Sequence, residues 1–140
     1  MQTESFKPLK FYSKQTDSRG VFQGIINQGT WQEVNVVHTK AFQMRGGHFH
    51  RHTTEVIFMM TGRAKVILTQ CDEAKQRVTF TLAEGEGIKI PPYTAHDFNY
   101  LEDSIHLQLL DLRFDPDEQD LFPFCTRSGG EMAQRELQPC

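Results

Sequence analysis

Short segments in which apolar and polar positions alternate cover most of the chain between residues 21 and 112. Such alternation is typical of β-strands, and these segments are rich in Val, Ile, Phe, Thr and Tyr. No stretch before residue 115 has the apolar period of about 3.6 residues that marks a helix. The pattern predicts at least eight strands: Val21–Ile26, Trp31–His38, Glu55–Met60, Arg63–Gln70, Gln76–Leu82, Gly87–Ile90, Ala95–Tyr100 and Ile105–Leu112.

Turn residues separate these segments at short intervals. Thr61-Gly62 predicts a tight hairpin, Cys71–Lys75 a polar hairpin loop, and Glu84–Gly87 a further turn. Pro91-Pro92 ends the strand before it, because proline cannot donate a hydrogen bond to a neighbouring strand. Many short strands at this spacing predict an all-β sandwich or a closed barrel of the jelly-roll type.

The length of 140 residues suits a single domain. After Asp115 the composition changes, and we expect Phe122, Pro123 and Phe124 to pack back onto the barrel in a short turn of helix. The last stretch is polar and punctuated by glycine. The sequence therefore predicts one β-barrel domain over residues 1–127 and a loosely ordered tail over residues 128–140.

Charge and hydropathy argue against several classes of function. Hydrophobic residues make up 38% and charged residues 24%, as in folded soluble proteins, and the formal net charge is −3. Nucleic-acid-binding domains of this size usually carry a basic excess, so no nucleic-acid partner is expected. The longest apolar run, Val56–Met60, is far shorter than the roughly 20 residues of a membrane span.

The N-terminal residues and the cysteines indicate a cytoplasmic protein. No apolar segment typical of a secretory signal follows Met1. Cys71, Cys125 and Cys140 are widely separated and form no C-x-x-C pair, which argues against a disulfide framework and a zinc ribbon. We expect three free thiols in a reducing compartment.

Three of the six histidines fall within residues 48–52. In a strand His48 and His50 point to the same face, because residues two apart do so. Glu55 opens the next apolar strand and shares its face with apolar side chains, where a carboxylate is costly unless it is paired or bound to a cation. Two imidazoles and a carboxylate suit zinc, iron, nickel or manganese.

A fourth candidate ligand, His96, follows the Pro91-Pro92 turn and opens a strand whose same-face neighbours are Phe98 and Tyr100. Alone, it would more often be an ordinary core or surface histidine. Together with the three residues above, it predicts one site, a divalent metal site, built by His48, His50, Glu55 and His96.

Two motifs in this region resemble the cupin superfamily. Gly47-His48-x-His50-x4-Glu55-x6-Gly62 matches the first cupin signature, and Gly85-x5-Pro91-x4-His96 is similar to the second. The resemblance implies a single-domain jelly-roll barrel (a double-stranded β-helix) with these two His, the Glu and the later His at one end, commonly around a divalent metal.

The second signature departs from the cupin pattern at two positions. Tyr93 stands where a glycine is usual, and Asn99 arrives one residue early, but neither change removes a ligand. The gap between His50 and Glu55 agrees with the first signature when His50 is the second histidine, which places His52 in the turn instead of at the metal.

A narrower resemblance starts upstream, in Asp17-x-Arg19-Gly20-x-Phe22 and Arg45-Gly46-x-His48. Both look like segments of the nucleotide-sugar cupins, which include dTDP-sugar 3,5-epimerases, dTDP-sugar 3,4-ketoisomerases and the C-terminal cupin domain of capsular polysaccharide enzymes. Phe114-Asp115-Pro116 resembles a segment that follows the last strand in the capsular group. The first segment is equally well explained as an ordinary turn into a strand.

If this resemblance holds, Arg19 and Arg45 bind the diphosphate of a nucleotide-sugar, because a guanidinium meets phosphate oxygens in pairs. His48 is then the candidate base that removes the proton beside the keto carbon. The resulting enolate needs a metal or fixed hydrogen-bond donors for its stabilisation.

Two departures limit this interpretation. The epimerases have a tyrosine acid just after the last strand, where this chain has Phe114, which cannot donate a proton. The epimerases and ketoisomerases generally lack the full ligand set, so this chain is more similar to the metal-containing capsular type.

Since one histidine cannot easily be both ligand and base, either the site is metal-free or another group takes the proton. The candidates are Tyr93, Tyr100 and His106, the last of which is equally explained as a barrel-wall residue.

Three functions remain open. The first is an isomerase or epimerase of a nucleotide-linked keto-sugar in surface polysaccharide synthesis. The second is a metal-dependent oxygenase or lyase, which would use iron and have no need of the two arginines. The third is a non-catalytic cupin that binds a small ligand or a structural metal. The resemblance also implies a homodimer, with which the outward apolar residues Val56, Phe58 and Met60 are compatible.

Overall fold

The computed structural model describes residues 6, 8–72 and 76–124 of the chain. Within these residues every extended regular element is a β-strand, and no helix is long and apolar enough to cross a membrane. The strands are β1 (Leu9–Lys10), β2 (Ser13–Asp17), β3 (Gly20–Gly24), β4 (Glu33–Thr39), β5 (Met44–Phe49), β6 (Glu55–Thr61), β7 (Arg63–Gln70), β8 (Arg77–Ala83), β9 (Glu86–Ile90), β10 (Thr94–Tyr100), β11 (Ser104–Leu110) and β12 (Phe122–Pro123).

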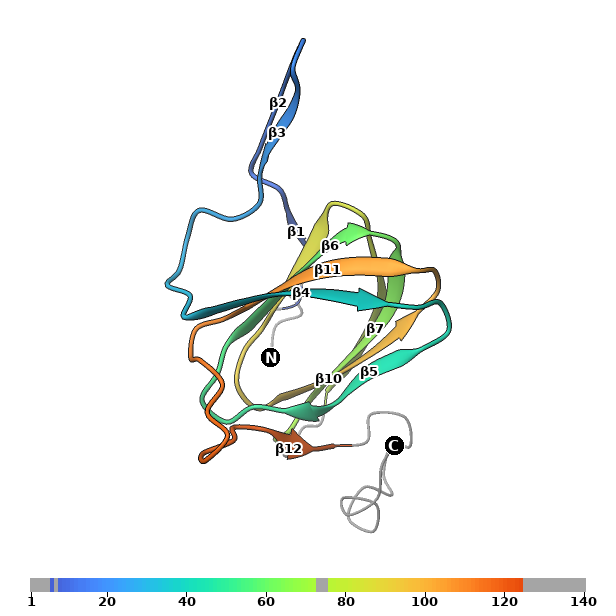
Figure 1. Cartoon of the computed structure of the whole chain (residues 1–140). Helices are drawn as coiled ribbons and strands as arrows, with labels where there is room; N and C mark the ends of the chain where they lie inside the picture. Colours follow the sequence, from blue (N-terminus) through green and yellow to red (C-terminus); the bar gives the residue numbers. More distant parts are fainter. Residues whose placement is uncertain (1–5, 7, 73–75, 125–140) are drawn as a thin grey trace.

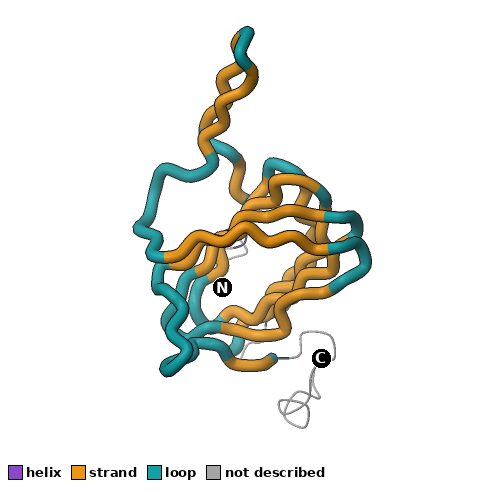
Figure 2. Tube along the Cα trace, in the orientation of Figure 1, coloured by secondary structure: helices purple, strands orange, loops and turns teal. Residues whose placement is uncertain are grey.

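Ten of these strands form two antiparallel sheets that face each other (Figure 1). One sheet has the order β1-β9-β6-β11-β4, and the other has the order β12-β5-β10-β7-β8. The remaining two strands, β2 and β3, pair only with each other and project from the sheets as a hairpin (Figures 1 and 2). The prediction of an all-β, single-domain jelly roll is confirmed.

Strand boundaries differ from the prediction in several places. β1, β2, β5 and β12 lie outside the eight predicted strands, and β3 starts and ends earlier than its predicted segment. The prediction of a short helical turn at residues 122–124 is wrong, because Phe122 and Pro123 pair with Phe49 and His48 of β5 as a strand. The predicted tail at residues 128–140 lies outside the described residues.

The core lies between the two sheets. The inward faces of β6, β7, β8, β9 and β10 contribute side chains that are almost completely buried. Each buried Val, Leu, Ile, Phe or Met among them stabilises the fold by about 1.5–3 kcal/mol through removal of apolar surface from water. The cluster consists of Phe6, Ile57, Met59, Ala64, Val66, Leu68, Leu82, Ile88, Ile90, Phe98 and Tyr100.

The outward face of β6 is covered by the chain's own N-terminal part. Val56 and Phe58 are each only 1% exposed, because a second cluster packs over them. The covering residues are Leu9, Phe11, Ile25, Ile26, Trp31 and Leu107. The expectation that Val56 and Phe58 form an outward dimer surface is therefore wrong. Exposed apolar side chains lie instead on β4, at Val34 and Val36, on the hairpin, at Val21 and Phe22, and in several connections, where Phe42 is the most exposed.

A β-bulge between β5 and β10 brings two histidines together. His48 pairs with His96, but the next residue of β10, Asp97, pairs with Gly46, so Gly47 is the extra residue. A Cβ at Gly46 would collide with the carbonyl oxygen of His96, and its φ of 102° also favours glycine. Bulges re-aim side chains, and this one accompanies the approach of His48 to His96.

Candidate functional site

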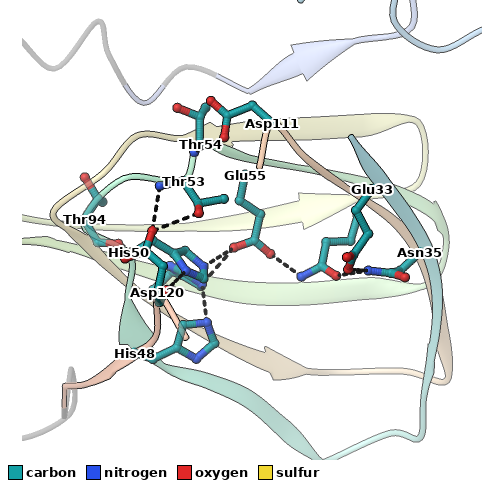
Figure 3. Close-up of polar contacts among 12 residues, drawn as sticks. Glu33, Asn35, His48, His50, Thr53, Thr54, Glu55, Thr94, Asp111 and Asp120 are labelled. Carbon is teal, nitrogen blue, oxygen red and sulfur yellow. Dashed lines mark hydrogen bonds and ion pairs between the residues drawn. The ribbon is translucent and has the colours of Figure 1, made fainter. Parts of the chain in front are cut away.

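Four predicted residues converge at one end of the interior. His48 comes from β5, His50 follows β5 directly, Glu55 opens β6 and His96 lies on β10. One nitrogen or oxygen atom from each lies within 4.8 Å of the corresponding atom of the other three (Figure 3). We call these four residues the quartet. His52, the competing candidate, is exposed and lies outside it.

Main-chain carbonyls hold two of the imidazole rings. Nδ1 of His50 contacts the carbonyl oxygen of Asp120, and Nδ1 of His96 lies 3.2 Å from that of Thr94. A carbonyl oxygen only accepts, so both Nδ1 atoms carry a proton in these hydrogen bonds. The Nε2 atom of each ring is thereby directed toward the centre of the quartet, the arrangement that metal-binding histidines commonly show.

Glu55 is buried and anionic at the centre. Burial opposes its ionisation, but His96 and hydrogen bonds from His50, His96 and Gln108 outweigh it and hold the pKa well below its usual value. Its Oε2 lies 3.2 Å from Nε2 of His50 and 3.2 Å from Nε2 of His96, while its Oε1 accepts a 2.7 Å hydrogen bond from Gln108. One oxygen is therefore held by the protein, and the other faces the quartet.

His48 and His50 differ in their affinity for a proton. Burial lowers the pKa of His48 to about 3, with a further contribution from the neighbouring His96, so His48 is neutral near pH 7. Burial also opposes protonation of His50, but Glu55 and the carbonyl of Asp120 outweigh it and raise the His50 pKa.

The donor set fits a divalent cation. Nε2 of His48 and Nε2 of His96 face each other at 3.0 Å, and both can donate an electron pair. Together with Nε2 of His50 and Oε2 of Glu55, they offer three imidazole nitrogens and one carboxylate oxygen, which suits zinc or another first-row transition metal.

A chain of side-chain amides supports Glu55 from behind. Gln108 donates to Glu55, Asn35 donates to Gln108 at 2.9 Å, and Asn35 also donates to Glu33 at 2.8 Å. Glu33 in turn accepts the main-chain N–H of Phe114 at 2.9 Å. Because the carboxylates at both ends only accept, the orientation of both amides is determined. Sequence reasoning missed this chain, although Gln108 shares its strand face with His106.

A second buried polar pair lies in the same interior. The Tyr100 hydroxyl and Nδ1 of His106 are 3.0 Å apart, and their rings stack with 6.0 Å between centroids. Burial lowers the pKa of His106 to about 4 and raises that of Tyr100 to about 12. Both groups are therefore neutral near pH 7. Tyr100 also hydrogen-bonds to Thr39, which accepts from Nε of Arg45 at 2.6 Å.

Two other predicted site residues lie away from the quartet. Arg19 stands at the tip of the β2–β3 hairpin, where its exposed side chain pairs with Asp17 at 2.7 Å. Tyr93 is half exposed, and its ring lies 6.1 Å from that of Phe49, whose position between His48 and His50 puts it on the opposite face of β5. The single chain does not bring either residue to the quartet.

A pocket of about 350 Å³ reaches His50 and Thr53. Its outer wall comes from the segment that connects β11 with β12, residues 111–121, including Leu112, Phe114 and Leu121. Asp115, Glu118 and Asp120 add carboxyl groups. The pocket offers apolar surface and hydrogen-bond acceptors next to one histidine of the quartet.

Several solved structures with a similar fold are described as sugar ketoisomerases or epimerases. The chain is similar to the QdtA 3,4-ketoisomerase of Thermoanaerobacterium thermosaccharolyticum in complex with TDP (TM-score 0.70, 20% identity, 86% of this chain and 88% of that chain). It is also similar to the rmlC epimerase of Mycobacterium tuberculosis (TM-score 0.72, 17% identity, 88% of this chain and 70% of that chain). A third similar structure is the dTDP-4-dehydrorhamnose 3,5-epimerase of Bacillus anthracis with TDP and PPi bound (TM-score 0.71, 21% identity, 84% of this chain and 77% of that chain). No curated protein sequence matches the chain.

The facing sheets and the likeness to these structures show that the chain has an RmlC-like cupin fold. A family profile described as the polysaccharide biosynthesis C-terminal domain matches residues 15–122. The chain therefore belongs to the polysaccharide biosynthesis C-terminal domain family.

Proposed function

We propose that the protein is a metal-dependent isomerase or epimerase that acts on a nucleotide-linked keto-sugar in polysaccharide synthesis. The observation that carries the proposal is the presence of two separate chemical groups in one interior: a quartet suited to a cation and a neutral Tyr100–His106 pair. The family assignment supports the pathway class, and the fold shared with dTDP-sugar enzymes supports the substrate class.

The quartet would hold a divalent metal through Nε2 of its three histidines and Oε2 of Glu55. Such a metal acts as a Lewis acid toward a carbonyl oxygen. His48 then serves as a ligand, since its Nε2 faces that of His96 inside the quartet. The same nitrogen cannot also abstract a proton.

Proton transfer falls to Tyr100 and His106. A neutral imidazole accepts a proton and a phenol donates one, so the 3.0 Å contact allows a relay. The proton beside the keto carbon passes to the Tyr100 oxygen while the hydroxyl proton passes to Nδ1 of His106. Return of the proton from the same side to the neighbouring carbon, while the hydroxyl proton of the sugar moves to the former carbonyl oxygen, completes isomerisation. Epimerisation would instead take a proton from water on the opposite face of the first carbon.

The arginines are proposed to bind the diphosphate. Arg45 is exposed, with two of its nitrogens bound to Thr39 and to the carbonyl of His38, and its remaining N–H groups are available to phosphate oxygens. Arg19 lies on the projecting hairpin, so we expect it to meet substrate only in a homodimer, in which the hairpin of one copy reaches the other.

Solvent isotope exchange tests the proposal directly. We expect dTDP-4-keto-6-deoxyglucose, incubated with metal-loaded protein in D₂O, to acquire deuterium beside the keto carbon, as observed by NMR. The His50→Ala/His96→Ala double variant is the control and should bind no metal and exchange no proton. Wild-type protein with one equivalent of zinc and no exchange of any nucleotide-linked keto-sugar would contradict the isomerase assignment. Bound iron with oxygen consumption would favour the oxygenase alternative.

A further inference from the structure

Asp120 makes an unusual number of contacts for a residue outside every recognised motif. Its Oδ1 accepts the main-chain N–H of Arg51 at 2.7 Å. Its Oδ2 accepts the N–H of His52 at 2.8 Å. The same oxygen accepts the N–H and the hydroxyl of Thr53, each at 2.8 Å (Figure 3). Three consecutive amides and one hydroxyl thus converge on one carboxylate, and such charge-assisted bonds are stronger than neutral ones.

These contacts order the connection between two members of the quartet. Residues 51–53 form most of the short turn that leads from His50 to Glu55. The main-chain oxygen of the same Asp120 accepts the proton of Nδ1 of His50. One residue therefore holds both the turn and the ring orientation of His50, with Nε2 directed at Glu55.

The segment around Asp120 is itself docked onto β5. Phe122 pairs with Phe49, and their rings lie 5.5 Å apart. The guanidinium of Arg51 lies 3.9 Å above the ring of Phe122. The N–H of Phe124 donates to the carbonyl of Gly47 at 2.7 Å. Asp120 thus enters the site from the connection just before β12, which is held against β5 by these contacts.

We propose that Asp120 is the positioning residue of the quartet: its carboxylate orders residues 51–53, and its carbonyl keeps His50 with the proton on Nδ1 and Nε2 directed at Glu55 and His96. The consequence for metal affinity rests on the proposed function. The ordering of residues 51–53 and of the His50 ring does not depend on the proposed function. A residue that merely anchored a surface loop would affect stability without changing His50.

Asp120→Asn is the decisive variant, because it keeps the shape of the side chain and removes the charge and one acceptor. Asp117→Asn is the matched control, since Asp117 is an exposed residue of the same segment outside the quartet and its turn. Thr53→Val removes only one of the four hydrogen bonds to the carboxylate and should give an intermediate effect. It also serves if Asp120→Asn does not fold.

The first readout is NMR of ¹⁵N-labelled, metal-free protein. In the wild type we expect a slowly exchanging His50 Nδ1 proton and protected amides at residues 51–53. In Asp120→Asn the Nδ1 proton should be lost to exchange, and the amides should exchange roughly 10–100-fold faster, as expected for a turn that opens locally. Unchanged signals in Asp120→Asn, or equal losses in Asp117→Asn, would overturn the proposal.

The second readout is Zn²⁺ affinity, measured by competition with a chromophoric chelator. Removal of a residue that orients a ligand weakens metal binding by about 10–100-fold, so we expect that loss in Asp120→Asn and less than about a twofold change in Asp117→Asn. Equal affinity of wild type and Asp120→Asn would contradict the proposed role. A wild type that binds no zinc would count against the proposed function alone, and the NMR result would still decide the role of Asp120.

Discussion

The quartet and the Tyr100–His106 pair are both buried in the same interior, but their hydrogen bonds are satisfied in different ways. The pair is closed, because a hydroxyl and an imidazole nitrogen meet at 3.0 Å and both groups are neutral. The quartet is open, because Nε2 of His48 lies 3.0 Å from Nε2 of His96, which also lies 3.2 Å from an oxygen of Glu55, so three atoms that can each donate an electron pair face one another. The difference teaches that buried histidines in one interior can serve different chemistry. An excess of electron pairs attracts a cation, whereas a closed neutral pair can pass a proton.

The largest effect is expected from Tyr100→Phe. Loss of the hydroxyl breaks the relay, so deuterium incorporation into the keto-sugar should fall by roughly 10²–10⁴-fold. The affinity for Zn²⁺, measured by chelator competition, should stay within about twofold, since Tyr100 is outside the quartet. A variant that lost zinc and retained exchange would reverse the two assignments.

Glu55→Gln tests the open cluster. The change removes the carboxylate of the quartet, so Zn²⁺ affinity should fall by about 100-fold or more, beyond the effect of a supporting residue. Isothermal titration gives the dissociation constant, and Tyr100→Phe is the control that should bind zinc normally. Undiminished binding would show that the carboxylate does not act as a ligand.

A smaller effect is expected behind the quartet, at Gln108→Ala. Loss of the 2.7 Å hydrogen bond frees Oε1 of Glu55 and should weaken Zn²⁺ binding by about tenfold. Gln23→Ala, an exposed glutamine on the hairpin, is the matched control. If both variants bind zinc equally well, the amide chain has no influence on the metal.

The smallest effect concerns the stability of the metal-free protein as a function of pH. His106 has a folded-state pKa of about 4, below the unfolded value of 6.5, so the unfolded state binds its proton more tightly. The free energy of unfolding should therefore decrease as pH falls from about 6.5 toward 4.

Urea denaturation at a series of pH values measures this slope. His106→Gln should reduce the slope by about 1 kcal/mol per pH unit over that range, because the titrating group is gone. His48 contributes a slope of the same sign, with a folded-state pKa of about 3, and its contribution should remain in the variant. An unchanged slope would mean that His106 is already charged in the folded state.

Local sequence determined eight of the twelve strands of the described residues and most of the quartet. The two-residue period of a strand places His48 and His50 on one face. Both could therefore be identified as candidate ligands without knowledge of distant residues. Glu55 at the head of an apolar strand carried its own signal, since an inward carboxylate needs a partner. His96 was predicted because the spacing Gly85-x5-Pro91-x4-His96 is similar to the second cupin signature. The strand of β5 itself was missed because its glycines and bulge interrupt the alternation.

Only the tertiary structure decided what surrounds those residues. Gln108 meets Glu55 across 53 positions, and Asp120 meets His50 across 70, and neither pairing has a local pattern. The outward face of β6 looked free in the sequence, yet the N-terminal segment covers Val56 and Phe58. Alternation reports which side of a strand a residue occupies. Which distant group completes its hydrogen bonds, or shields it from water, depends on how the strands are ordered in the sheets.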